Sequence, residues 1–165
     1  LSAQTFWNTK PEEMSSIITL IETIVADLSP DAEFVFGLKG WLNLKADDKN
    51  FPCVLLVEPI SSTDIARQGG LYESTYSIFM IFLDKTQLRD TPQQQRVVVD
   101  AMRTLQRQFI LRMKAALVTG TNEHIFKDIS DIRVDDTFNE LDVNASGVAL
   151  TFRCTPLNSD SICVS

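Results

Sequence analysis

The chain has 165 residues, 44% of them hydrophobic, and its 22 acidic side chains outnumber 15 Lys and Arg, giving a formal net charge of −7. This length suits one domain with a real hydrophobic core, and the apolar content excludes wholesale disorder. The acidic balance argues against a protein whose main task is to grip nucleic acid, because phosphate binding needs clustered Lys and Arg. The longest unbroken apolar run, residues 78–83, is far shorter than the roughly 20 residues of a membrane-spanning helix, so we expect no membrane association.

Residues 1–10 are expected to form a lead-in segment whose only large apolar groups are Phe6 and Trp7. These two side chains either fill a groove on the same domain or dock on a neighbouring subunit. Leu1 is an unusual first residue, and we expect residues to precede it. Residues 157–165 are expected to form a polar tail, which leaves residues 11–156 as a single domain.

Residues 11–28 are expected to form an amphipathic helix, because their apolar side chains follow helical spacing. The outer side of this helix is hydroxylic and acidic and includes Glu12 and Asp27. The apolar side consists of Met14, Ile17, Ile18, Ile21, Ile24, Val25 and Leu28.

Two strands are expected next, over residues 33–44 and 51–58. The second is almost continuously apolar, which predicts a strand buried on both faces. Residues 46–50 read as a turn at a hairpin tip, with Asp47 and Asp48 in solvent. Pro59 is expected to end the second strand.

Residues 60–70 read as a polar loop that is too long for a tight hairpin, and Gly69-Gly70 indicates mobility. Residues 71–84 then form a long strand. Its first half alternates and its second half is continuously apolar, so one end is expected to face water or a partner and the other to lie in the core.

The central element is a long helix over residues 91–118. Thr91 is a good N-cap, Pro92 suits the first helical position, and Gln94 completes a capping-box pattern. Gly120 follows the last apolar residues, as a left-handed C-terminal residue should.

Strands over residues 129–138 and 148–155 complete the domain. Ile132, Val134 and Phe138 alternate along the first of them. The predicted order is α-β-β-β-α-β-β, an α+β fold with a largely antiparallel, mixed sheet against two helices.

The search for catalytic chemistry finds no phosphate loop, nucleophile elbow or zinc motif, so we expect no enzyme and no cofactor. His124, the only histidine, lies in a loop without a defined partner. The cysteines, Cys53, Cys154 and Cys163, do not form a disulfide framework, and the first two are expected to be small buried apolar groups. Residues 142–147 match the opening of a calcium loop, but position twelve is Arg153, and a plain hairpin turn is the alternative.

Charge is placed unevenly on the central helix. Arg96, Arg103, Arg107 and Lys114 fall within a narrow arc, opposite an apolar side made of Val98, Met102, Leu105, Phe109 and Ala116. One interpretation is a pair of solvated helix faces. The other is a subunit interface in which this basic arc meets the acidic outer side of the first helix, and such a head-to-tail contact closes into a ring.

The element order resembles that of the tail-terminator and tail-completion proteins of tailed bacteriophages, and of related neck-ring proteins including those of crAss-like phages. The segments that carry this resemblance are PEEMSSIITLIETIV, FPCVLLVEP, the Gly-Gly loop, YSIFMIFLD, TPQQQRVVVDAMRTLQRQF and VALTFRCTP. The likeness is one of pattern and order over residues 11–156, without a signature site residue.

The resemblance implies a non-enzymatic subunit of a hexameric or dodecameric ring at the head–tail junction of a virion, assembled in the host cytoplasm beside other neck and tail proteins. The loop with Arg67, Gln68, Gly69 and Gly70 would face the channel or an adjoining ring. An acidic lumen would let DNA pass without specific binding. The alternative is a soluble cellular adaptor or binding module without catalysis, which a cleft lined by His124 and residues 60–70 would favour.

Overall fold

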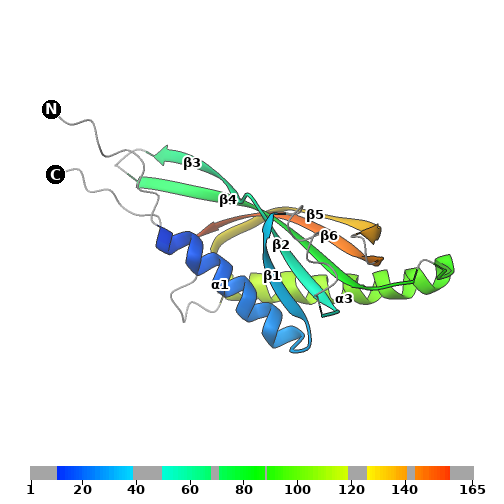
Figure 1. Ribbon diagram of the computed structural model, residues 1–165. Coiled ribbons are helices and arrows are strands. Elements are labelled where there is room, and N and C mark those ends of the chain that lie inside the picture. Colours follow the sequence, from blue (N-terminus) through cyan, green and yellow to red (C-terminus); the bar gives the residue numbers. More distant parts are fainter. Residues whose placement is uncertain are drawn as a thin grey trace.

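The computed structural model describes residues 11–38, 50–67, 71–87, 89–118, 126–140 and 144–156. Two helices lie on one side of a six-stranded sheet (Figure 1). The elements in chain order are α1 (Pro11–Leu28), β1 (Glu33–Leu38), β2 (Cys53–Glu58), β3 (Ser61–Arg67), β4 (Leu71–Lys85), α3 (Pro92–Val118), β5 (Phe126–Glu140) and β6 (Ala145–Pro156). The predicted α+β class, with a mostly antiparallel mixed sheet and two helices, is confirmed, and the structure adds one strand, β3.

The sheet is built around β4, which is paired along both of its edges. The strand order is β1-β2-β4-β6-β5, and β3 pairs with β4 beyond the end of β2. Only β1 and β2 run parallel; the other pairs are antiparallel. The predicted long strand over residues 71–84 is therefore confirmed, and its apolar half is the part that β2 and β6 enclose.

The parallel pairing of β1 with β2 corrects the interpretation of residues 46–50 as a hairpin tip. Parallel neighbours cannot be joined by a tight turn, because the chain must return to the end of the sheet at which it started. The two strands are therefore not the two sides of a hairpin. Residues 39–49, including the predicted turn with Asp47 and Asp48, lie outside the described residues. The described part of the first strand ends at Leu38.

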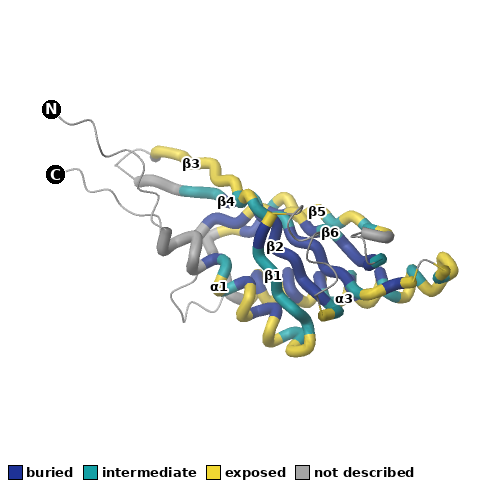
Figure 2. Tube along the Cα trace, in the orientation of Figure 1, coloured by how far each residue is buried: buried dark blue, intermediate teal, exposed yellow. Residues whose placement is uncertain are grey.

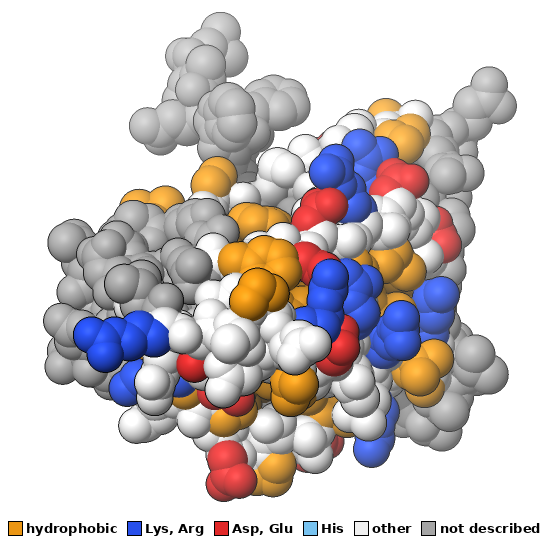
Figure 3. Space-filling model, turned by 90° about the vertical axis from the view of Figure 1, so that its right-hand side faces the viewer, with side chains coloured by type: hydrophobic (Ala, Val, Ile, Leu, Met, Phe, Trp, Pro, Cys, Tyr) orange, Lys and Arg blue, Asp and Glu red, His pale blue; other side chains and the backbone are white. Residues whose placement is uncertain are grey.

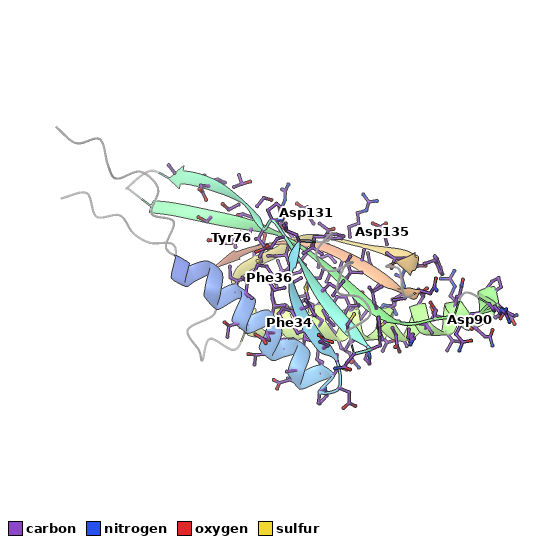
Figure 4. The ribbon with its side chains drawn as sticks, viewed as in Figure 1. Phe34, Phe36, Tyr76, Asp90, Asp131 and Asp135 are labelled. Atoms are coloured by element: carbon purple, nitrogen blue, oxygen red, sulfur yellow. The ribbon has the colours of Figure 1, made fainter. Side chains whose placement is uncertain are left out.

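The hydrophobic core lies between the helices and the sheet. Ile17, Ile21 and Val25 of α1 are buried there, as the helical spacing predicts. Phe34 and Phe36 of β1 pack against this core from its margin (Figure 4). A second, smaller apolar cluster occupies the opposite face of the sheet and consists of Cys53, Leu55, Val57, Ile81, Leu83 and Ala145. Since β2 contributes to both clusters, its predicted burial on both faces is confirmed.

The prediction of a loop over residues 60–70 is wrong. Residues 61–67 form β3, which pairs in a regular antiparallel register with residues 71–77 of β4, from Ser61↔Ser77 to Arg67↔Leu71. Pro59 interrupts β2 without ending the extended chain, because β2 and β3 follow one another along the same edge of β4. The polar composition concealed this strand, since neither of its faces is buried.

The N-terminus of α3 is capped as predicted. The side-chain oxygen of Gln94 accepts from the amide nitrogen of Thr91 at 2.8 Å, and the hydroxyl of Thr91 accepts from the amide of Gln94 at 3.3 Å. These reciprocal bonds satisfy two backbone N–H groups at the start of the helix. Farther along, the Phe109 ring packs against Phe82 of β4 and Phe152 of β6, at centroid distances of 5.8 and 6.2 Å. This aromatic contact fixes α3 on the sheet.

β5 is an edge strand with an irregular ladder. Its register with β6 shifts near both ends and between Ser130 and Arg133, where Asp131 has a positive φ of 51°. As a result, Ile132 and Phe138 are exposed, whereas Val134 packs against the core. The three apolar residues therefore do not share one buried face, contrary to their simple alternation in the sequence.

The hydrogen bonds at the start of β6 give a structural reason for the calcium-like pattern of residues 142–147. Asn144, with a φ of 54°, offers its carbonyl oxygen to the amide and hydroxyl of Thr86 at 2.8 and 2.9 Å. The Ser146 hydroxyl is buried 3.1 Å from that of Thr86, and Gly147 is already part of the strand opposite Leu83. These contacts favour the hairpin interpretation for the described residues of the pattern, whereas Asp142 lies outside them.

Cys53 and Cys154 are not in disulfide bonds, and both are buried, as predicted. Burial raises the pKa of Cys154 to about 12, because the core cannot solvate a thiolate. The thiol of Cys154 is therefore unreactive at neutral pH.

Gly147→Ala is expected to lower the free energy of unfolding by about 3 kcal/mol, since overpacking against backbone cannot be relieved by a side-chain rotation. A Cβ at Gly147 would lie 1.8 Å from the carbonyl oxygen of Phe82. Urea denaturation monitored by circular dichroism measures the change. Thr151→Ala, at an exposed position of the same strand, is the control and should change stability by less than about 0.5 kcal/mol. Equal stability of Gly147→Ala and wild type would contradict the argument.

Candidate interaction surface

Two of the four basic residues predicted to form an interface on α3 are bound within the same chain. Arg96 donates to the Asp136 carboxylate at 2.8 Å, and Arg103 donates to the other oxygen of the same carboxylate. Asp136 lies on the helix-facing side of β5, opposite Val148. The two arginines therefore attach α3 to an edge strand, and sequence reasoning missed this because no local spacing links residues 33 to 40 positions apart.

The paired arginines change the acidity of Asp136. Their guanidinium groups, Arg103 first, hold the pKa of this carboxyl below its ordinary value, against a smaller opposing effect of burial. The Arg103 side chain is 30% exposed, whereas that of Arg96 is 56% exposed and is screened more strongly by water. The contact with Arg103 is accordingly the stronger of the two.

Met102 and Phe109 are buried as predicted, but the buried side of α3 is not centred where the prediction placed it. It consists of Val99, Met102, Gln106, Phe109, Ile110 and Met113. Compared with the predicted side this stripe is rotated by roughly 60°, at 3.6 residues per turn, toward the arginines. Val98 and Leu105 are only half-buried, and the basic arc borders the core instead of lying opposite it. The rotation brings Arg96 and Arg103 beside β5.

Arg107 and Lys114 are exposed, and neither forms an ion pair with another described residue. Asp27 is exposed on α1, whereas the side chain of Glu12 and all of Trp7 lie outside the described residues. The predicted contact between the basic arc and the outer side of α1 in a neighbouring subunit stays a prediction. Arg107 is the cleaner position at which to test it, because changing Arg103 also disturbs the bond to Asp136.

A second surface is the arm, which we define as β3 together with residues 71–77 of β4. The arm extends away from the body of the sheet (Figure 1), and residues 61–66 are all exposed (Figure 2). β3 packs along β4 and makes no comparable contact with another described element. Of the predicted loop candidates, Arg67 ends β3, while Gln68, Gly69 and Gly70 lie outside the described residues.

The base of the arm is fixed to the sheet by side chains. The hydroxyls of Thr75 in β4 and Thr155 in β6 lie 2.8 Å apart. Tyr76, the next residue of β4 (Figure 4), is buried. The arm is therefore anchored where it leaves the sheet, while residues 61–66 of β3 are exposed.

The described residues offer little for chemistry. No group of three or more potential metal ligands occurs among them, and His124 lies outside them. On the face shown in Figure 3, both acidic and basic side chains are present, and apolar groups lie between them. On β5, for example, Arg133 pairs with Asp135 at 2.8 Å, and Asp131 pairs with Arg153 of β6 at 3.2 Å. In the described part of the chain, neither helix is long and apolar enough to cross a membrane.

No protein-family profile matches this sequence, and none of the curated proteins compared with it is similar.

Asp136→Asn is expected to reduce the free energy of unfolding by about 1 kcal/mol at pH 7, because it removes the charge that both arginines bind. A lowered pKa in the folded state means that this stabilisation is complete above the ordinary aspartate pKa of about 4 and is lost as the pH falls through the lowered value. Urea unfolding of wild type and variant should therefore differ at pH 7 and converge as the pH falls below about 4.

Asp135→Asn is the matched control, because Asp135 pairs only with the strongly exposed Arg133 among the described residues. Asp135→Asn should lower the free energy of unfolding by less than half as much as Asp136→Asn does. A gap between wild type and Asp136→Asn that stays constant down to pH 3 would show that the charge is not responsible.

Proposed function

We propose that the chain is a structural, non-enzymatic subunit of an oligomeric ring at the head–tail junction of a tailed bacteriophage. In this role it bridges adjoining neck and tail proteins and lines part of the channel through which DNA passes. The proposal rests on the resemblance in element order and on one structural observation, the arm. Rings of six or twelve subunits are the expected assemblies.

The arm supports the proposal because it is poorly stabilised by its own chain. A two-stranded hairpin is marginally stable in water unless a third strand or a helix covers it. No described element covers β3, and its residues 61–66 are exposed. A neighbouring subunit that packs against the arm would supply the missing contacts.

The unprotected edge of β3 also supports a contact with a neighbouring subunit. Soluble proteins protect exposed strand edges with bulges and charges, as β5 does with three register shifts and several carboxylates. β3 has an unbroken register, and Asp64 and Arg67 are its only charged residues. An edge of this kind suits a protein–protein contact.

The net charge of −7 is compatible with a channel that DNA must leave freely, since like charges do not adhere. The same charge gives no basis for specific DNA binding. The proposed location is the neck or tail of the virion, reached after assembly in the host cytoplasm.

The direct test is the mass of the purified protein at micromolar concentration. Native mass spectrometry or mass photometry is expected to give six or twelve copies, and negative-stain images should show rings with a central opening. A stable monomer, alone and with neck proteins present, would contradict the ring and favour the adaptor module.

Trypsin provides a separate test of the arm. Cleavage after Arg67 is expected to be at least tenfold slower in the assembled protein than in protein diluted to monomers, because a neighbour covers the arm. Mass spectrometry of the fragments follows the reaction, and Arg67→Gln, which lacks the cleavage site, identifies the correct fragment. Equal cleavage rates in the two states would remove the arm from the subunit contact.

A further inference from the structure

The outer side of α3 carries a continuous uncharged stripe that no described element covers. Its members recur at alternating spacings of four and three residues: Val97, Ala101, Thr104, Gln108 and Leu111. All five are exposed, and Val97 and Leu111, at 70% and 66%, are the two most exposed large apolar residues of the described chain. We call these five residues the outer stripe.

The spacing of the outer stripe is that of a coiled-coil seam, which faces a partner helix every 3.5 residues. Thr104 is less polar here than its type suggests, because its hydroxyl donates to the Asp100 carbonyl oxygen at 3.0 Å within the helix. Half-buried Val98 and Leu105 widen the stripe on one side. The stripe thus offers a mostly apolar strip to a second helix.

Charged residues border the stripe at seven-residue intervals. Asp100, Arg107 and Lys114 follow one side, at the positions that flank a coiled-coil seam, and all three are exposed. In an antiparallel pair of identical helices, flanking residues of this kind meet their counterparts on the other helix. The order of signs along this border therefore restricts which partner fits.

We infer that the outer stripe binds the outer stripe of a second copy of the chain, with the two α3 helices antiparallel about a two-fold axis at Thr104. In this register Val97 lies opposite Leu111 of the second copy, twice by symmetry. Asp100 comes beside Arg107 of the second copy, also twice. Apolar contact and charge complementarity are satisfied by the same register.

The outer side of α1 in a neighbour is the competing occupant. It exposes Glu22 and Asp27, and α1 contains no basic residue, so it would suit Arg107 and Lys114. Its exposed described residues, however, include no large apolar side chain to cover Val97 and Leu111. The second α3 offers both kinds of contact and is the better match.

This contact goes beyond the ring proposal. A two-fold contact is complete with two subunits, whereas a ring needs a head-to-tail contact. The pair therefore stands or falls independently of whether the arm closes a ring. Where both contacts form, the α3 pair joins two rings, which is one way to reach twelve copies.

Thr104→Cys, in a Cys163→Ser background, tests the axis. Two cysteines at a two-fold axis can reach disulfide distance, so mild oxidation is expected to cross-link most of the protein into covalent dimers. Val97→Cys in the same background is the matched control. Its two copies would be separated by roughly 21 Å along the helices, at 1.5 Å per residue, and should not cross-link. The inference would be overturned if Thr104→Cys and Val97→Cys cross-linked equally, or if neither cross-linked.

A charge swap tests the register and separates the two occupants. Asp100→Arg is expected to weaken the α3 pair at least tenfold, because it places like charges together. The double variant Asp100→Arg/Arg107→Asp should return to within about threefold of wild type, measured by sedimentation equilibrium and by cross-linking of added Thr104→Cys. If α1 were the partner, the double variant would bind no better than the single one, and the inference would be wrong.

Val97→Glu/Leu111→Glu should abolish the pair, while Leu38→Glu, at an apolar position that is 56% exposed on β1, should leave it intact. Circular dichroism confirms that each variant is folded. If both variants lost the pair, or if both kept it, a contact through α3 would be contradicted. The size of any ring is measured separately, so a failed pair and a failed ring give different results.

Discussion

The fold depends on the backbone pairing of β4. A buried strand must find a partner for every N–H and C=O group, because water cannot supply one. β6 pairs with one edge of β4 from Tyr76 to Lys85, and β2 and β3 pair with the other edge over residues 80–83 and 71–77. Phe82, in the half of β4 that lies between β2 and β6, then packs against Phe109 of α3, as does Phe152 of β6. The arm, the core and the position of α3 are all consequences of this one long strand.

α3 joins parts of the molecule that the sheet alone leaves apart. Its buried side rests on the sheet, and Arg96 and Arg103 hold β5 through Asp136. Because these arginines are occupied within the chain, they are less available to a neighbouring subunit than their sequence position suggests. The contact surface that remains is farther round the helix, where Val97 and Leu111 are exposed. One helix thus provides the internal brace and also presents an exposed side with two large apolar residues.

Signals that act within a few residues were sufficient to predict much of this fold. The Thr91–Gln94 cap, the burial of β2 on both faces and the burial of Cys53 and Cys154 all follow from local chemistry and composition. The failures concern contacts between distant segments. β3 lacks an apolar face to reveal it, the parallel partner of β1 is not encoded locally, and the bonds of Arg96 and Arg103 to Asp136 join segments that are far apart in the sequence. Of the candidate site, the basic arc does lie on α3 as predicted, but the side of this helix that packs on the sheet could not be predicted fully.

The continuity of β4 has a mechanical consequence. The arm and the sheet share this strand, so a pull on the arm along its axis is carried directly into the pairs between Tyr76↔Cys154 and Lys85↔Ala145. These antiparallel hydrogen bonds are perpendicular to the strand and would be loaded together in shear, so they cannot open one at a time. Such a joint resists load far better than a hairpin peeled from its end. A subunit attached to its neighbour through this arm would transmit tension into the regular pairing of β4 with β6.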